Sequence, residues 1–135
     1  MKTRANSTFT VDNWDEEPLD DWAGIGLTRT RLTKTFKGDL EGSSVVLATM
    51  LKTPAGSMAY VAFEHFTARI GEREGTFVLE HSTRMSSRGQ FGDWIIVPDS
   101  GTGDLTGIAG TGEILKSGDE QVFQLDYEFE SRERP

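Results

Sequence analysis

The sequence predicts an all-β protein built as a single eight-stranded, mainly antiparallel β-barrel. Three observations predict it. Short segments of alternating apolar and polar residues recur along the 135-residue chain, and short turns rich in glycine and proline separate them. No segment carries the apolar stripe of an amphipathic helix. Consecutive antiparallel strands of this number close into a barrel or stack as a sandwich, and closure removes exposed edges.

The predicted strands follow one another with short connections. They are residues 8–14, 27–37, 43–52, 57–70, 75–85, 90–98, 103–115 and 121–130. Glycine supplies the positive φ of tight turns and proline presets the first turn dihedral, as in Thr53-Pro54-Ala55-Gly56 after the third strand. Because connections this short cannot make a parallel crossover, we expect antiparallel neighbours.

Two later stretches need separate justification. The stretch 101–112 is dense in glycine, which suits a bulge or barrel corner where a side chain would crowd the bend. The charges of the last segment resemble a helix fragment, but Phe123, Leu125, Tyr127 and Phe129 alternate with polar residues. This alternation is typical of a strand with one solvent-exposed face.

Residues 13–26 depart from the strand pattern. They are strongly acidic and include Trp14, Pro18 and Trp22. The segment is longer than a hairpin requires. We therefore predict one domain over residues 1–135, with a long acidic connection at about 13–26 that lies over a barrel end.

Composition excludes several classes of function. The chain has no cysteine and two histidines at no ligand-like spacing, so we expect no disulfide, no metal site and no cofactor. Its net charge of −8 disfavours nucleic acid and anionic membranes. No apolar run approaches the roughly 20 residues of a membrane span, and the first residues lack the apolar stretch of a secretory signal. We expect a cytoplasmic protein.

Alternation assigns side chains to the two faces of the fourth and fifth strands. A turn centred on Glu72-Arg73 predicts a register that buries one apolar face. The pairs in that register are Ala68 with Phe77, Phe66 with Leu79, and Glu64 with His81. Glu64 and His81 would then be cross-strand neighbours, within roughly 5 Å at Cβ.

A buried carboxylate beside an imidazole suggests chemistry. Each group stabilises the other's charge, and burial moves both pKa values from their solution references. Such a pair can move a proton at neutral pH, as enolisation, isomerisation or cyclisation requires. The alternative is a structural pair, because buried polar groups need partners whether or not they do chemistry.

Other side chains are candidates for the wall of an interior cavity. Lys34 shares its face with Leu32 and Phe36, and we expect it to reach solvent beside the nearby turn. Trp94 lies in a segment with two apolar faces, so alternation does not orient it. The sequence has no phosphate loop and no nucleophile-elbow serine. The predicted cavity-lining residues are Tyr60, Phe66, Phe77, Leu79, Trp94 and Tyr127.

The order of motifs along the chain resembles an uncharacterised bacterial family, a domain of unknown function of about this length. The motifs are WDE from Trp14, LTKTFKGDLEG from Leu32, FEHFT from Phe63, GTFVLEH from Gly75, WIIVPDSGTG from Trp94 and LDYE from Leu125. In fold this family resembles the barrel of plant allene oxide cyclase. The resemblance implies eight strands and, among related barrels, cyclases that act on lipid or polyketide-like substrates. Glu64 and His81 lie within these motifs, and the family supplies no established catalytic residues to carry over.

Two functional hypotheses follow. In the first, the barrel binds a small apolar molecule, and Glu64 and His81 are the polar groups that contact it. If the protein is an enzyme, we expect a cofactor-free isomerase or cyclase in which the barrel fixes a reactive conformer of the substrate. In the second, side chains fill the barrel, and the protein is an accessory or interaction protein that uses the acidic Trp14–Trp22 segment. Under either hypothesis we expect that barrel packing can produce a homo-oligomer.

Overall fold

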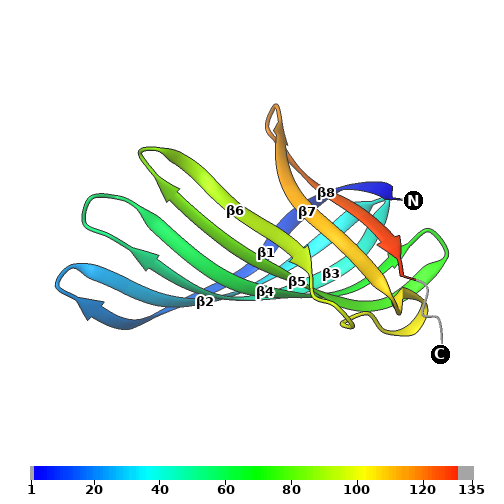
Figure 1. The fold of residues 1–135 in the computed structure, drawn as a ribbon, viewed down its shortest axis with the longest axis horizontal. Coiled ribbons are helices and arrows are strands. Elements are labelled where there is room, and N and C mark those ends of the chain that lie inside the picture. Colours follow the sequence, from blue (N-terminus) through cyan, green and yellow to red (C-terminus); the bar gives the residue numbers. More distant parts are fainter. Residues whose placement is uncertain (1, 131–135) are drawn as a thin grey trace.

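The computed structural model describes residues 2–130, which form a closed antiparallel barrel. Each strand pairs with its neighbours in sequence, and β8 pairs with β1 to close the ring (Figure 1). The predicted fold class is confirmed. The strands are β1 (Thr3–Trp22), β2 (Ile25–Gly38), β3 (Leu40–Lys52), β4 (Met58–Ile70), β5 (Arg73–Ser86), β6 (Gly89–Ile96), β7 (Ile108–Ser117) and β8 (Glu120–Phe129).

The predicted acidic connection at 13–26 is wrong, because β1 continues to Trp22 and β2 begins at Ile25. Ala23 and Gly24, both at positive φ, make the turn between them, as a two-residue hairpin requires. Acidic residues of β1 lie opposite arginines of β2, for example Glu17 opposite Arg29. β8 pairs with β1 only as far as Thr8, so the rest of β1 is an edge, where a proline such as Pro18 is tolerated.

The glycine-dense stretch makes a corner before it makes a strand. Gly103–Leu105 form a 3₁₀ turn, and β7 begins later than predicted, at Ile108. Leu105 is fully buried and closes this end of the core. A Cβ at Gly101 would lie 2.0 Å from the carbonyl oxygen of Leu105, so a larger residue would push the turn away.

The register between β4 and β5 differs from the predicted one by two residues. Gly71, at φ 63°, and Glu72 form the hairpin turn, so the turn lies one residue earlier than expected. A shift of two keeps every side chain on its predicted face, so the inward residues were assigned correctly. The observed pairs are Phe66 with Phe77, Glu64 with Leu79, and Ala62 with His81.

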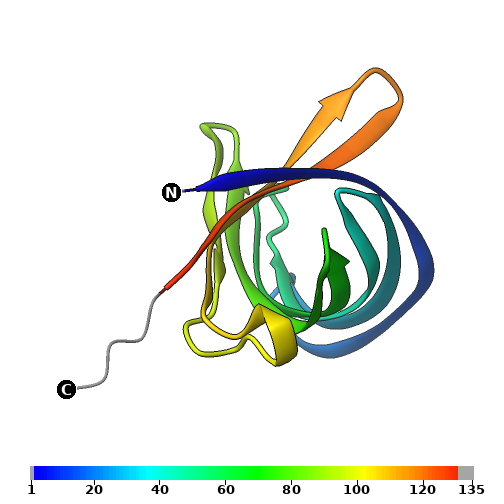
Figure 2. The ribbon, with the colours of Figure 1, turned by 90° about the vertical axis from the view of Figure 1, so that its right-hand side faces the viewer.

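Aromatic side chains fill one end of the barrel. The Phe66 and Phe77 rings stack with centroids 4.7 Å apart, and Phe123 lies 5.5 Å from Phe66. Phe36 contacts both Phe66 and Phe123. These four rings, with Leu79 and Leu125, are almost completely buried and pack together inside the barrel at this end. Figure 2, which looks toward this end, shows the closed ring of strands with the β7–β8 hairpin standing away from it.

The other end of the barrel is open. The β1–β2, β3–β4 and β5–β6 hairpins extend past the core (Figure 1), and β6 meets β7 through the single pair Ile95 and Thr111. Met50, Tyr60 and Met85 are partly exposed on the inner face of these hairpins. The barrel therefore combines a packed end with an open, largely apolar one.

Candidate functional site

The centre of the site is the carboxylate of Glu64, on the inner face of β4 and 1% exposed. Three strands supply side chains to it. Ser44 Oγ of β3 donates a hydrogen bond to Glu64 Oε2 at 2.6 Å, and Lys34 Nζ of β2 lies 3.5 Å from the same oxygen. His81 Nε2 of β5 lies 2.9 Å from Oε1. We call Lys34, Ser44, Glu64 and His81 the carboxylate cluster.

The contact between Glu64 and His81 has the distance of a hydrogen bond without its alignment. Neither Glu64 Oε1 nor His81 Nε2 makes an aligned hydrogen bond within the described residues. Thr30 Oγ1, also buried, lacks a hydrogen-bond partner there as well. Buried polar atoms are normally paired, so the inner face retains unused hydrogen-bonding capacity next to its charged groups.

The environment of Glu64 favours its ionised form. Burial, the largest single effect, would by itself raise the pKa of the carboxyl group. The contact with His81, the charge of Lys34 and the hydrogen bond from Ser44 together outweigh burial, so the pKa of Glu64 is lowered from its ordinary value. The cluster therefore holds a carboxylate at neutral pH inside the barrel, where most of the other buried side chains are apolar.

The expectation that Lys34 reaches solvent is wrong, because Lys34 is 8% exposed. Its Nζ lies 4.9 Å from the centroid of the Phe9 ring and faces the Glu64 carboxylate. The carboxylate offsets the desolvation of the ammonium group, and the ring adds a cation–π contact. Lys34 is thus part of the site.

Trp94, which the sequence did not orient, faces the interior. It lies opposite His81 in the β5–β6 register, and the indole stacks on the imidazole with centroids 3.8 Å apart and 30° between planes. Trp94 also borders a pocket of about 270 Å³ in the gap between β6 and β7, which we call the gap pocket. Its walls are Thr83, Gln90, Gly92, Trp94, Gly112, Glu113 and Ile114.

The six predicted cavity-lining residues do not surround one cavity. Phe66, Phe77 and Leu79 have no exposed surface and belong to the packed core. Tyr60 packs on a separate cluster, and Tyr127 borders a pocket with Arg4 and Arg69 at the packed end. Of the six, Trp94 is the one that contacts the predicted Glu64–His81 pair through a ring stack.

Sequence reasoning missed Ser44 and Thr30. Both share a face with apolar neighbours, Ser44 with Val46 and Thr30 with Leu32, and this alternation was the available signal. Within residues 2–130, no three histidine, aspartate or glutamate side chains come together as a metal site. In the same part of the chain, no helix has the length and apolar character needed to cross a membrane.

Comparison with known proteins supports the resemblance. The family described as "Protein of unknown function (DUF3224)" matches residues 5–130. A crystal structure of a DUF3224 family protein of unknown function from Shewanella oneidensis MR-1 is similar, with a TM-score of 0.84 and 30% sequence identity over 98% of this chain and 100% of that one. No curated protein matches the chain. The chain therefore belongs to the DUF3224 family.

Proposed function

We propose that this protein binds a small, largely apolar molecule in the gap pocket, against the Trp94 side chain. The observation that carries the proposal is the position of Trp94, whose ring forms a pocket wall and also covers His81 of the carboxylate cluster. A ligand site of this kind combines an apolar wall with a few placed polar groups.

The size and lining of the pocket indicate the class of ligand. A volume of about 270 Å³ lies just below the usual range of ligand pockets, roughly 300–1,000 Å³, which limits the ligand to a small molecule. Trp94 and Ile114 offer apolar contacts, while Glu113, Gln90 and the buried Thr83 offer polar ones. A compact, largely apolar molecule that also presents hydroxyl groups to these polar side chains fits these walls.

Binding is better supported than turnover. An isomerase or cyclase needs its proton-transfer group within hydrogen-bond reach of the substrate. His81 is 3% exposed and lies behind Trp94. A cofactor-free isomerase or cyclase acting through Glu64 and His81 would require the indole to swing off the imidazole when substrate enters.

A second function is favoured by a different observation. The core is filled at one end, and Trp14, Leu19 and Trp22 are about half exposed on the acidic β1–β2 hairpin. Tryptophan is enriched in protein–protein interfaces. These residues support the alternative of an accessory protein that contacts its partner through this hairpin.

Titration with Nile red, a neutral apolar dye, tests the proposal. The variant Ile114→Asp places a carboxylate on the pocket wall, and its matched control Leu115→Asp changes the next residue, which is exposed on β7. We expect the Kd of the dye to rise about tenfold or more in Ile114→Asp, because desolvating a charge is costly, and to stay unchanged in Leu115→Asp.

A second variant distinguishes the loss of the pocket from misfolding of Ile114→Asp. Gln90 is exposed at the pocket rim, so Gln90→Trp fills the entrance without disturbing the core and should weaken dye binding similarly. Equal dye affinity in the wild type, Ile114→Asp and Gln90→Trp would overturn the proposal.

A further inference from the structure

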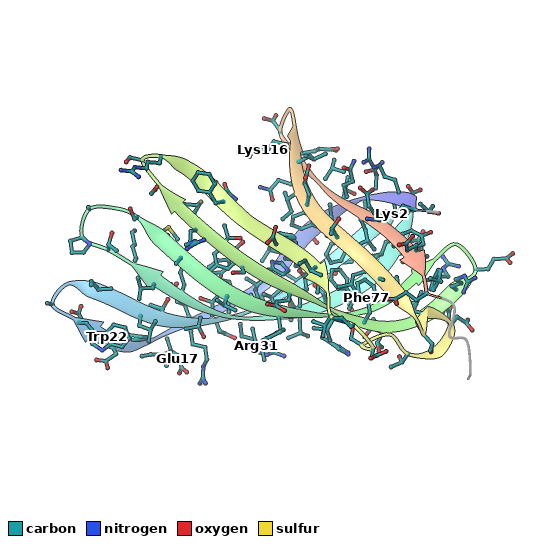
Figure 3. The ribbon with its side chains drawn as sticks, viewed as in Figure 1. Lys2, Glu17, Trp22, Arg31, Phe77 and Lys116 are labelled. Carbon is teal, nitrogen blue, oxygen red and sulfur yellow. The ribbon has the colours of Figure 1, made fainter. Side chains whose placement is uncertain are left out.

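The pairing of β6 with β7 stops where two carboxylates would face each other. The two strands are joined at Ile95 and Thr111. Two residues further along the same register, Asp93 of β6 would lie opposite Glu113 of β7. Like charges directly opposite each other destabilise a strand pair. Beyond this point the β7–β8 hairpin, with Lys116 near its tip, stands apart from β6 (Figure 3), so the gap pocket opens between two acidic residues.

Both carboxylates lie on the outer side of the gap pocket without a cation. The side chains of Asp93 and Glu113 alternate with inward-facing neighbours, so they point to the outer face of the sheet. Within residues 2–130, neither side chain makes an ion pair. Arg4 interacts with the charge of Glu113, but its guanidinium group donates two hydrogen bonds to Asp126. The negative charge at this opening is therefore not neutralised by a partner.

A buried hydroxyl group in the same pocket also lacks a partner. Thr83 is 3% exposed and is part of the pocket wall. In the described part of the chain, its side chain makes no hydrogen bond. Buried polar groups are normally paired, so the Thr83 hydroxyl can donate one hydrogen bond to a ligand and accept another from it.

We propose that the ligand of the gap pocket is a hydroxyl-bearing organic cation, with its alkylammonium group between Asp93 and Glu113. This inference rests on the proposed function and specifies the chemistry of its ligand. The Trp94 side chain supplies an aromatic wall, on which alkylammonium groups are commonly recognised. The two carboxylates supply the opposite charge, and Thr83 supplies the hydrogen bond to the ligand hydroxyl group.

The charge of the pocket distinguishes this class of ligand from the others. Among the described residues that line the gap pocket, Glu113 is the one that carries a charge. The net charge of −8 attracts cations and repels anions. An anionic ligand would add a third negative charge at the opening, and a neutral one would leave both carboxylates unpaired. A bare metal ion would leave the apolar surface of Trp94 and Ile114 without contacts.

Displacement of Nile red by a charged and an uncharged competitor of the same shape tests this inference. The competitors are choline and the dimethylbutanol in which a carbon atom replaces the choline nitrogen, compared at constant ionic strength. In the wild type, choline should displace the dye at an about tenfold lower concentration, because of the aromatic wall and the two carboxylates. In the double variant Asp93→Asn with Glu113→Gln, the two competitors should be equally effective.

Asp119→Asn with Glu120→Gln is the matched control. It removes the same number of charges through the same substitutions, between β7 and β8 and outside the gap pocket, so the preference for choline should persist. Thr83→Val should weaken both competitors by the same factor, because both carry the hydroxyl group. Each preference is a ratio measured on one variant, so a change in pocket shape that affects both competitors cancels.

Three results would overturn the inference. They are equal displacement by the two competitors in the wild type, a preference for choline that survives in the double variant Asp93→Asn with Glu113→Gln, and a preference lost equally in the matched control. Nile red affinity that is equal in the wild type, Ile114→Asp and Gln90→Trp would instead overturn the proposed function. The two failures are therefore distinguishable.

Discussion

His81 contacts Glu64 diagonally across two strands. Their atoms Nε2 and Oε1 are 2.9 Å apart, although β4–β5 pairing places Ala62 opposite His81 and Leu79 opposite Glu64. The short side chain of Ala62 leaves room for the imidazole to lean toward the carboxylate. The site thus depends on a small residue beside it as well as on its charged ones.

Glu64→Gln should destabilise the protein most at neutral pH. Removing one partner from a buried ion cluster leaves Lys34 unpaired, at a cost of about 3–5 kcal/mol. The folded-state pKa of Glu64 is lowered from 4.5, so its contribution to stability is present above pH 4.5 and is lost as pH falls through the folded-state pKa. Urea unfolding of both proteins from pH 7 to pH 3 should show the stability gap narrowing at the acid end.

Asp126→Asn is the control for that pH dependence. The hydrogen bond from Arg4 is the main cause that lowers the pKa of Asp126, but this pair is exposed, and exposed pairs contribute little. A pH-independent gap between the wild type and Glu64→Gln would contradict the assignment of an ionised Glu64.

Glu64, His81 and Lys34 of the carboxylate cluster should be replaceable by apolar residues together, whereas Glu64 and His81 alone should not. Glu64→Leu combined with His81→Leu leaves the buried Lys34 without its partner, and we expect a loss of about 3–5 kcal/mol. Adding Lys34→Met should restore stability to the wild-type value or above it, because replacement of a complete buried ion cluster is often neutral or stabilising. Guanidinium unfolding of the double and triple variants measures the difference. A triple variant less stable than the double would show that Lys34 is stabilised by other contacts.

Trp94→Ala should cost about 3 kcal/mol, since it removes a partly buried indole and opens the stack on His81. Trp94→Phe keeps an aromatic ring there and should cost less than about 1.5 kcal/mol. Thermal unfolding monitored by far-ultraviolet circular dichroism separates the two. Equal losses in both variants would mean that the stack contributes nothing specific.

Phe77→Ala should destabilise the packed end by about 3–5 kcal/mol, because its fully buried ring stacks on Phe66. Phe91→Ala, at an exposed position on β6, should change stability by no more than about 0.5 kcal/mol. Chemical unfolding of the two variants compares a core ring with a surface ring. A small loss in Phe77→Ala would contradict the packed core.

Alternation and turn residues were sufficient to predict the barrel, because both are local properties of the chain. They also placed Glu64 and His81 on one inner face. The exact register was missed although a signal was present: a two-residue turn favours glycine at its first central position, and Gly71 is that residue, at φ 63°. The predicted turn at Glu72-Arg73 left Gly71 in the strand, and alternation did not reveal the error because both registers bury the same face.

Two features that the sequence did not predict depend on contacts between residues far apart in the chain. Lys34 was expected to reach solvent, because nothing near it in sequence shows that Glu64 of β4, two strands away in the sheet, is its partner. The acidic end of β1 looked like a loop because its residues have weak strand propensity. In the structure its pairing with Arg29 and Arg31 of β2 overrides that propensity. In both cases the deciding partner is set by the closed barrel.

Native mass spectrometry of the wild-type protein purified from its own host, before and after organic extraction, tests the binding function most directly. The account predicts a stoichiometric excess mass that extraction removes, identified as a compact, largely apolar molecule, and its loss from Ile114→Asp but not from Leu115→Asp. A wild-type mass equal to that of the chain alone, together with Nile red affinity unaffected by Ile114→Asp, would contradict it.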